Sequence, residues 1–187
     1  MLDETTTAPL GEEEMRTLVR DEVRRALERE PATRKAAFIA SKGTLDWAYP
    51  PLILSTTAAA SGMEVAVFFT FYGLNIIHRD FDRKLKVDPV GNPAMPMPVR
   101  VPDVLTAMPG MVPAATAMMK RRFASHNVAT IGELLDAARE SGVRLIACQM
   151  TMDVFGYTED DFVAGVEFGG AAMFLSEARR GHVTLFV

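Results

Sequence analysis

Short apolar runs alternate along the chain with segments that have helical features. Five runs are as short and as rich in aliphatic, β-branched or aromatic residues as buried strands usually are: 35–41, 64–71, 143–148, 166–168 and 182–187. Segments of helical character separate them: one ending near 61, then 73–81, 130–141, 158–164 and 170–180. This alternation predicts a three-layer α/β/α fold with a mostly parallel five-stranded sheet.

Prolines and a capping residue mark the ends of several predicted elements. Pro50 and Pro51 indicate that the helix ending near Ser61 either begins near Tyr49 or is kinked there. Thr158, with Asp161 three residues later, is expected to cap the short helix that follows it. Residues 82–103 contain five prolines and are expected to form an irregular loop.

The first 34 residues differ from the rest of the chain. Residues 1–10 are expected to be disordered, and Gly11–Glu30 is predicted to be a helix that Pro31 ends. Its apolar residues form one stripe: Met15, Leu18, Val19, Val23, Ala26 and Leu27. We therefore expect an N-terminal tail and amphipathic helix at 1–34 and an α/β domain at 35–187, with the helix docked on the body or on a second subunit.

Charge and composition narrow the function classes. The 187 residues carry a net charge of −4, and residues 35–187 are nearly neutral, with fifteen acidic and fourteen basic side chains. This balance argues against nucleic-acid binding and favours self-association or a small ligand. No signal peptide is visible, and the uncharged stretch 104–119 is too short to span a membrane. One cysteine cannot form an intrachain disulfide, so we expect a soluble, cytoplasmic protein.

The only cysteine, Cys148, ends the third predicted strand. In open α/β sheets, ligands bind beyond the carboxyl ends of the strands, so Cys148 is the candidate catalytic residue, expected at the mouth of a crevice. The loop QMTMDVFGY follows it, and the backbone from Gln149 to Gly156 would stabilise the thiolate. If 151–155 formed a helical turn, its free N–H groups would favour the anion further.

Other residues are candidates for support of this thiol. Met150 and Met152 would surround the thiol with polarisable thioethers and little water. Asp153 could orient the loop by accepting hydrogen bonds from backbone N–H groups. Lys42 lies in the first strand-to-helix turn, at the same edge of the sheet, and either lines the pocket or only supports the turn. His126 follows three basic residues and either assists the thiolate or belongs to a solvated helix end.

The sequence predicts neither a cofactor nor a metal. The glycine patterns of dinucleotide and phosphate-binding loops are missing, and the three histidines form no paired metal-binding motif. Residues 95–119 carry six methionines, which favours core or subunit packing; a lid or a peripheral membrane contact is the less favoured alternative.

Three segments resemble DsrE2-type members of the DsrE/DsrF-like family: FIASKGTLDWAYPPLILSTTAAASGMEVAVFFTFYGLNII (38–77), GVRLIACQMTMDVFGYTEDDF (142–162) and GGAAMFLSEARRGHVTLFV (169–187). The second segment contains a cysteine before a Met-x-Met-Asp loop with a downstream glycine, as the family does. The likeness covers most of 35–187 and not the N-terminal helix. Three positions depart mildly, since Ser61 and Phe155 often correspond to methionine and Thr151 to serine.

The resemblance implies a three-layer α/β/α homo-oligomer whose cysteine accepts sulfane sulfur as a persulfide and passes it to a partner. The implied partners are a small carrier of the TusA type or a rhodanese. Relatives are often labelled as peroxiredoxins or as adjuncts of NAD(FAD)-dependent dehydrogenases, but the missing glycine pattern speaks against the dehydrogenase label.

Our main hypothesis is therefore a sulfur carrier or sulfurtransferase acting through Cys148, with its status as an enzyme left open. The first alternative is a non-catalytic oligomeric binding or assembly module, because free cysteine is often buried and inert. The weaker alternative is a thiol peroxidase with Cys148 as its peroxidatic residue. A dithiol oxidoreductase would need a resolving cysteine, which this chain lacks.

Overall fold

The computed structural model describes residues 11–28, 34–88 and 110–187. Contacts divide the chain into two units, Met1–Ala32 and Thr33–Val187, and each is described by itself. The first unit contains helix α1 (Glu12–Glu28), close to the predicted bounds. The expected disorder of 1–10 and most of the expected loop at 82–103 lie outside the described residues.

Five strands form the sheet of the second unit, and each matches a predicted apolar run. They are β1 (Lys35–Ala40), β2 (Glu64–Phe69), β3 (Arg144–Cys148), β4 (Val166–Gly169) and β5 (Val183–Phe186). Their order is β4-β3-β2-β1-β5, and every neighbouring pair is parallel. The five carboxyl ends therefore lie at one edge of the sheet.

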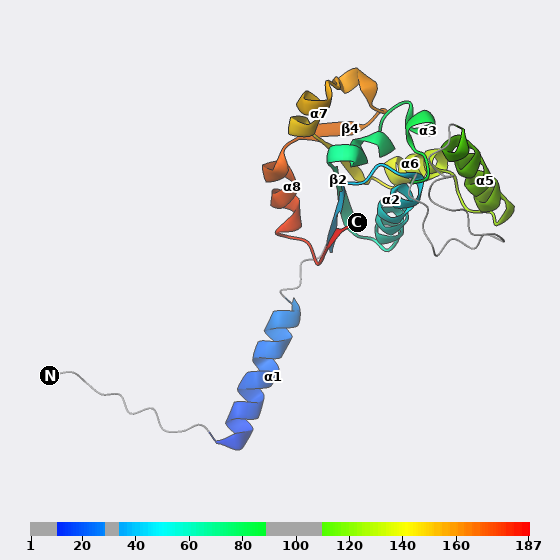
Figure 1. The fold of residues 1–187 in the computed structure, drawn as a ribbon. Helices are drawn as coiled ribbons and strands as arrows, with labels where there is room; N and C mark the ends of the chain where they lie inside the picture. Colours follow the sequence, from blue (N-terminus) through cyan, green and yellow to red (C-terminus); the bar gives the residue numbers. More distant parts are fainter. Residues whose placement is uncertain (1–10, 29–33, 89–109) are drawn as a thin grey trace. The chain divides into compact units, whose positions relative to one another are not determined.

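Helices cover both faces of the sheet (Figure 1). On one face α2 (Leu45–Ala60) and α6 (Ile131–Glu140) pack into the larger core cluster, to which α5 (Met111–Ser125) adds apolar side chains. On the other face α8 (Ala171–Ala178) packs through Phe174 into a smaller cluster. The predicted three-layer α/β/α fold is confirmed.

Four shorter elements complete the second unit. They are the 3-10 helices η1 (Phe71–Ile76) and η2 (Glu159–Asp161) and the helices α3 (Phe81–Lys84) and α7 (Gln149–Phe155). Among the described residues, no helix has both the length and the apolar character needed to cross a membrane.

Some local predictions were wrong. Of the two alternatives for helix α2, a start near Tyr49 is wrong: the helix begins at Leu45 and runs through Pro50 and Pro51, because it buries Leu45 and other apolar side chains against the sheet. The solvated helix end considered for His126 is the C-terminus of α5, but the body of this helix was not predicted, because the methionine-rich pattern within 95–119 shows no clear period. The part of that segment before residue 110 lies outside the described residues.

The chain after Cys148 also differs from expectation. The segment expected as a loop is helix α7, which begins at Gln149, includes the helical turn considered for 151–155 and ends at Gly156 in the left-handed conformation. The predicted helix at 158–164 is only the turn η2, although the capping box between Thr158 and Asp161 is present as expected. The 3-10 helix η1 covers only the first part of 73–81.

Two glycines allow the loops after β1 and β2 to meet at the carboxyl edge. The N–H of Thr70 donates to the carbonyl oxygen of Ala40 at 3.0 Å, which joins the ends of the two strands. A Cβ on Gly73 would overlap that carbonyl oxygen, and a Cβ on Gly43 would overlap the carbonyl oxygen of Tyr72. Backbone approach this close leaves no room for any side chain.

Substitution of either glycine is expected to destabilise the protein. Gly73→Ala and Gly43→Ala should each lower the free energy of unfolding in urea by about 3 kcal/mol, because the added methyl forces the two loops apart. Gly132→Ala is the matched control, since a Cβ there meets the ring of Phe81 at 3.5 Å and the Thr130 hydroxyl at 4.0 Å, both ordinary contacts. Equal stabilities of G73A and G132A would contradict this account of the loop contact.

Candidate functional site

Cys148 lies at the junction of β3 and α7. It is the last residue of the strand and the N-cap of the helix, and it pairs with Gly169 at the end of β4. Its side chain belongs to the smaller core cluster, with Ile146 of the same strand and Phe174 of α8. The only thiol therefore sits at the carboxyl edge of an internal strand, on the face that α8 covers.

Two threonine hydroxyls accompany the sulfur. Thr70, directly after β2, and Thr151, in the first turn of α7, both form hydrogen bonds with Cys148. Their oxygens lie 3.2 Å apart, and the N–H of Phe71 donates to the Thr151 hydroxyl at 3.3 Å. Since that N–H uses a lone pair of the Thr151 oxygen, the hydroxyl proton remains available to the sulfur or to Thr70.

A left-handed residue helps to form this arrangement. Phe71 has a φ of 47°, a conformation that is rare for a bulky side chain. It turns the chain from β2 into η1, and its N–H reaches Thr151 from that turn. Backbone strain of this kind persists where the surrounding contacts hold it in place.

These contacts favour the thiolate. Burial alone would raise the pKa of the Cys148 thiol. Hydrogen bonds from the hydroxyl and N–H of Thr151, the hydroxyl of Thr70 and the N–H of Met150 outweigh burial and lower the pKa below that of an ordinary cysteine. A thiolate at this position can act as a nucleophile.

The sulfur is less open to solvent than the sequence led us to expect. Cys148 is 5% exposed, and it lines none of the four pockets described for the structured part of the chain. The physical reason is local: α7 begins at the next residue, so its first turn folds over the sulfur where a loop was expected. The expected crevice mouth at Cys148 is thus closed in this conformation.

The supporting residues expected on the same segment lie differently around it. Gln149, Met150 and Asp153 are exposed on α7, and only the N–H of Met150 bonds to Cys148. Met152 is buried in the larger cluster, across the sheet from the sulfur. Another methionine, Met173 of α8, packs against the cluster that contains Cys148.

The structure shows no bond between Cys148 and the side chain of Asp153, Lys42 or His126 among the described residues. The backbone carbonyl of Asp153, and not its carboxylate, accepts the N–H of Gly156 at the end of α7. The Lys42 ammonium lies 3.5 Å from the centroid of the Trp47 ring. His126 is exposed at the C-terminus of α5, a helix of the opposite face, and has no bond to Cys148 among the described residues.

Thr70 and Thr151 were missed as site residues in the sequence. Thr70 lies within a predicted strand that neighbours the strand of Cys148, which is the signal that could have placed it at the same edge. The backbone N–H groups of 151–155 were considered as support for the thiolate, but the hydroxyl of Thr151 was not. Among the described residues, no group of three His, Cys, Asp or Glu side chains is placed to hold a metal ion.

Comparisons with known proteins place these observations in a family. Residues 32–186 match the model of the DsrE/DsrF/DrsH-like family. Sulfur carrier protein DsrE2 of Allochromatium vinosum is 48% identical over 158 residues, which are 82% of this chain and 98% of that protein. Uncharacterized protein YrkE of Bacillus subtilis is 30% identical over 161 residues, 83% and 98% of the two chains. The resemblance seen in three sequence segments is thereby confirmed.

Loss of the Thr151 hydroxyl is expected to raise the pKa of the Cys148 thiol. In Thr151→Val the thiolate loses a donor, so less of the thiol is ionised at neutral pH and iodoacetamide should react about tenfold more slowly. The pH midpoint of the alkylation rate should move upward. Thr57→Val, at an exposed position of α2, is the control and should leave the midpoint unchanged. An unchanged midpoint in T151V would show that the hydroxyl does not stabilise the anion.

Proposed function

Since the chain belongs to the DsrE/DsrF/DrsH-like family, we propose that it is a sulfur carrier that holds sulfane sulfur as a persulfide on Cys148. The observation that carries the proposal is the sole thiol at the carboxyl edge of β3, with its anion stabilised by two hydroxyls and two N–H groups. The 48% identity to a protein named as a sulfur carrier supports the same role.

The loading step is a thiol–persulfide exchange. The Cys148 thiolate attacks the outer sulfur of a donor persulfide, R–S–SH, and forms the new S–S bond. The donor's own S–S bond breaks, and its electron pair leaves with the inner sulfur as R–S⁻. The proton stays on the transferred sulfur, the Cys148 sulfur is oxidised and the donor's inner sulfur is reduced, so that no external oxidant is needed.

Unloading is the same exchange in the opposite sense. A partner thiolate attacks the outer sulfur of the Cys148 persulfide, takes it with its proton, and leaves Cys148 as the thiolate. One thiol suffices for both steps, which suits a chain with a single cysteine. A TusA-type carrier and a rhodanese are the proposed protein partners, and the reducing cytoplasm, where free thiols persist, is the proposed location.

Room for the added sulfur is proposed to come from Met173. The new S–S bond adds about 2 Å beyond the Cys148 sulfur. Gly169, the residue paired with Cys148, has no side chain, and the thioether of Met173 packs against its backbone. Because methionine is flexible, Met173 can move without disturbing the strands.

A second candidate function is favoured by one observation, the burial of Cys148. An inert, buried thiol would suit a non-catalytic assembly module. The two functions differ in native-state reactivity: a carrier thiol reacts with a small alkylating agent at neutral pH, whereas the module's thiol reacts only after unfolding.

Assembly into a homo-oligomer through β5 is part of the proposal. β5 is the last strand of the sheet and all four of its residues are exposed, among them Leu185 and Phe186 at 43% and 70%. An apolar strand with an unpaired edge tends to pair with another chain. A second copy of the same edge is the occupant we propose.

Substitution of Phe186 tests this contact. Phe186→Lys is expected to lower the molar mass measured by sedimentation equilibrium, because a charge on the edge strand disfavours pairing. Ile53→Lys, at an exposed apolar position of α2, is the control and should sediment like the unchanged protein. The proposed interface would be contradicted if the protein without substitutions were a monomer, or if F186K kept the same molar mass as that protein.

The carrier function is tested by intact mass spectrometry. Incubation with inorganic polysulfide, or with thiosulfate and a rhodanese, is expected to add one sulfur atom per chain, and dithiothreitol should remove it. Cys148→Ser is the control that should take up no sulfur. If the native chain gains no sulfur from any of these donors while its thiol is intact, the carrier function is wrong.

A further inference from the structure

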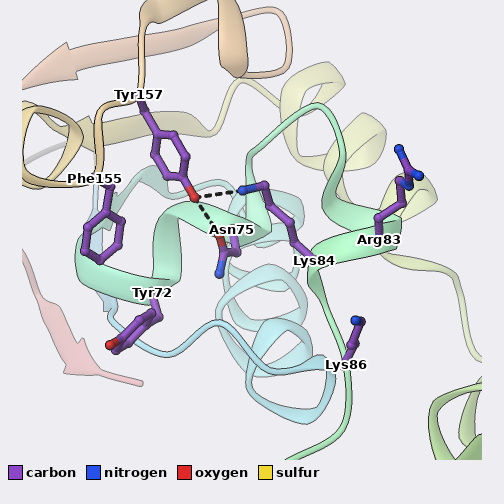
Figure 2. A pocket seen from close by; sticks show the side chains of 7 residues that line it. All are labelled: Tyr72, Asn75, Arg83, Lys84, Lys86, Phe155 and Tyr157. Atoms are coloured by element: carbon purple, nitrogen blue, oxygen red, sulfur yellow. Dashed lines mark hydrogen bonds between the residues drawn. The ribbon is translucent and has the colours of Figure 1, made fainter. Parts of the chain in front are cut away.

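A pocket of about 520 Å³ opens close to the site at the carboxyl edge. Its lining combines aromatic and cationic side chains: Tyr72, Asn75, Arg83, Lys84, Lys86, Phe155 and Tyr157. Figure 2 shows the three aromatic rings along one side and the three cations along the other, with Asn75 between them. We call it the basic–aromatic pocket.

Lys84 is held in place at the centre of this pocket. Its ammonium donates to the Tyr157 hydroxyl at 2.8 Å and lies 4.6 Å from the centroid of the Tyr157 ring (Figure 2). The Tyr157 hydroxyl donates in turn to the side-chain oxygen of Asn75 at 3.3 Å. Tyr157 and Asn75 are both neutral, so this chain of hydrogen bonds does not cancel the positive charge of Lys84.

The pocket carries an excess of positive charge. None of its lining residues is acidic, and Arg83, Lys84 and Lys86 form no ion pair within the described part of the chain. Three cations gathered in one pocket attract anions, and the aromatic walls offer contact to the uncharged part of a ligand.

Two chain segments connect the pocket to Cys148. Tyr72 lies two residues after Thr70, whose hydroxyl bonds to the sulfur. Phe155 is the last residue of α7, of which Cys148 is the N-cap. Seven helical residues at 1.5 Å each place Phe155 about 10 Å from Cys148 along the helix. A chain of about three extended residues spans the same length.

We propose that the basic–aromatic pocket binds the anionic groups of a small organic persulfide and so directs its sulfane sulfur to Cys148. The ligand class is a thiol-bearing molecule of about tripeptide length that carries at least two carboxylates. This inference rests on the proposed carrier function and names its donor. The pocket volume lies in the range of small-molecule sites, which suits such a donor.

The exchange itself is the one already written for loading. The carboxylates stay on Arg83, Lys84 and Lys86 while the outer sulfur passes to Cys148, and the leaving thiolate remains bound until the reduced ligand dissociates. The three cations take up no proton and break no bond. They are positioning residues, and their effect depends on the charge of the donor.

The test compares two donors on the full chain. Glutathione persulfide carries two carboxylates, and 2-hydroxyethyl persulfide carries none. The double variant Arg83→Gln/Lys86→Gln removes two charges and leaves the Lys84–Tyr157–Asn75 contacts intact. Arg121→Gln, an exposed cation of α5, is the matched control. The measured quantity is the rate of sulfur addition to Cys148, followed by quenched-flow mass spectrometry at low donor concentration.

The double variant is expected to load about tenfold more slowly from glutathione persulfide, the effect of losing two favourable charge contacts. Loading from 2-hydroxyethyl persulfide should be unchanged, as should both rates in R121Q. Higher salt should slow only the reaction with glutathione persulfide. Unchanged rates in the double variant would overturn the inference, and so would an equal loss with both donors, because that loss would place the effect on Cys148 itself.

A binding measurement separates this inference from the proposed function. S-methylglutathione carries the same carboxylates and transfers no sulfur, so calorimetry should detect its binding to the unchanged protein and to Cys148→Ser, with weaker binding to the double variant. Binding of S-methylglutathione without sulfur transfer from any donor would contradict the carrier function, but it would still support the basic–aromatic pocket as a binding site for this ligand class. Transfer without binding, or a charge effect seen only with an acidic carrier protein as donor, would overturn the small-molecule assignment.

Discussion

A buried sulfur anion is stable only where hydrogen bonds replace the water that burial removes. Around Cys148 the replacement comes from two places, the hydroxyl of Thr70 after β2 and the first turn of α7 with the hydroxyl of Thr151. Because β2 and β3 are neighbours, their ends bring Thr70 and Cys148 together, and because α7 begins directly after the cysteine, its N–H groups face the sulfur. The same contacts of the fold thus lower the pKa of the Cys148 thiol and shield its sulfur from solvent.

The carboxyl edge around this thiol is assembled from backbone contacts that side chains would prevent. Gly43 and Gly73 let the loops after β1 and β2 close on each other, and Tyr72 and Asn75, which flank Gly73 in η1, line the basic–aromatic pocket. Helix α7 connects the same two places, since Cys148 precedes it and Phe155 ends it. Nucleophile and pocket therefore share two rigid connections, which suits a site that must hold a donor in one orientation.

The fold could be predicted from the sequence because each strand is a distinct apolar run, and Cys148 could be placed at the ligand-binding edge because it ends one of them. The details around the sulfur could not. The segment QMTMDVF has no apolar face that distinguishes a short helix from a loop, and strand ends alone do not say that Thr70 meets Thr151. The methionine beside the thiol is Met173 rather than Met152, since Met152 faces the opposite core cluster. Thr151 in place of the family's serine retains the hydroxyl, which explains why that departure is mild.

The ionisation of Cys148 in the folded protein is the claim on which the rest depends. The direct measurement is the ultraviolet absorbance of the thiolate as a function of pH, taken as the difference between the unchanged chain and Cys148→Ser, first folded and then unfolded. Hydrogen bonding that outweighs burial puts the folded midpoint below the unfolded one. A folded midpoint above the unfolded one would mean that burial prevails and that the thiol is inert.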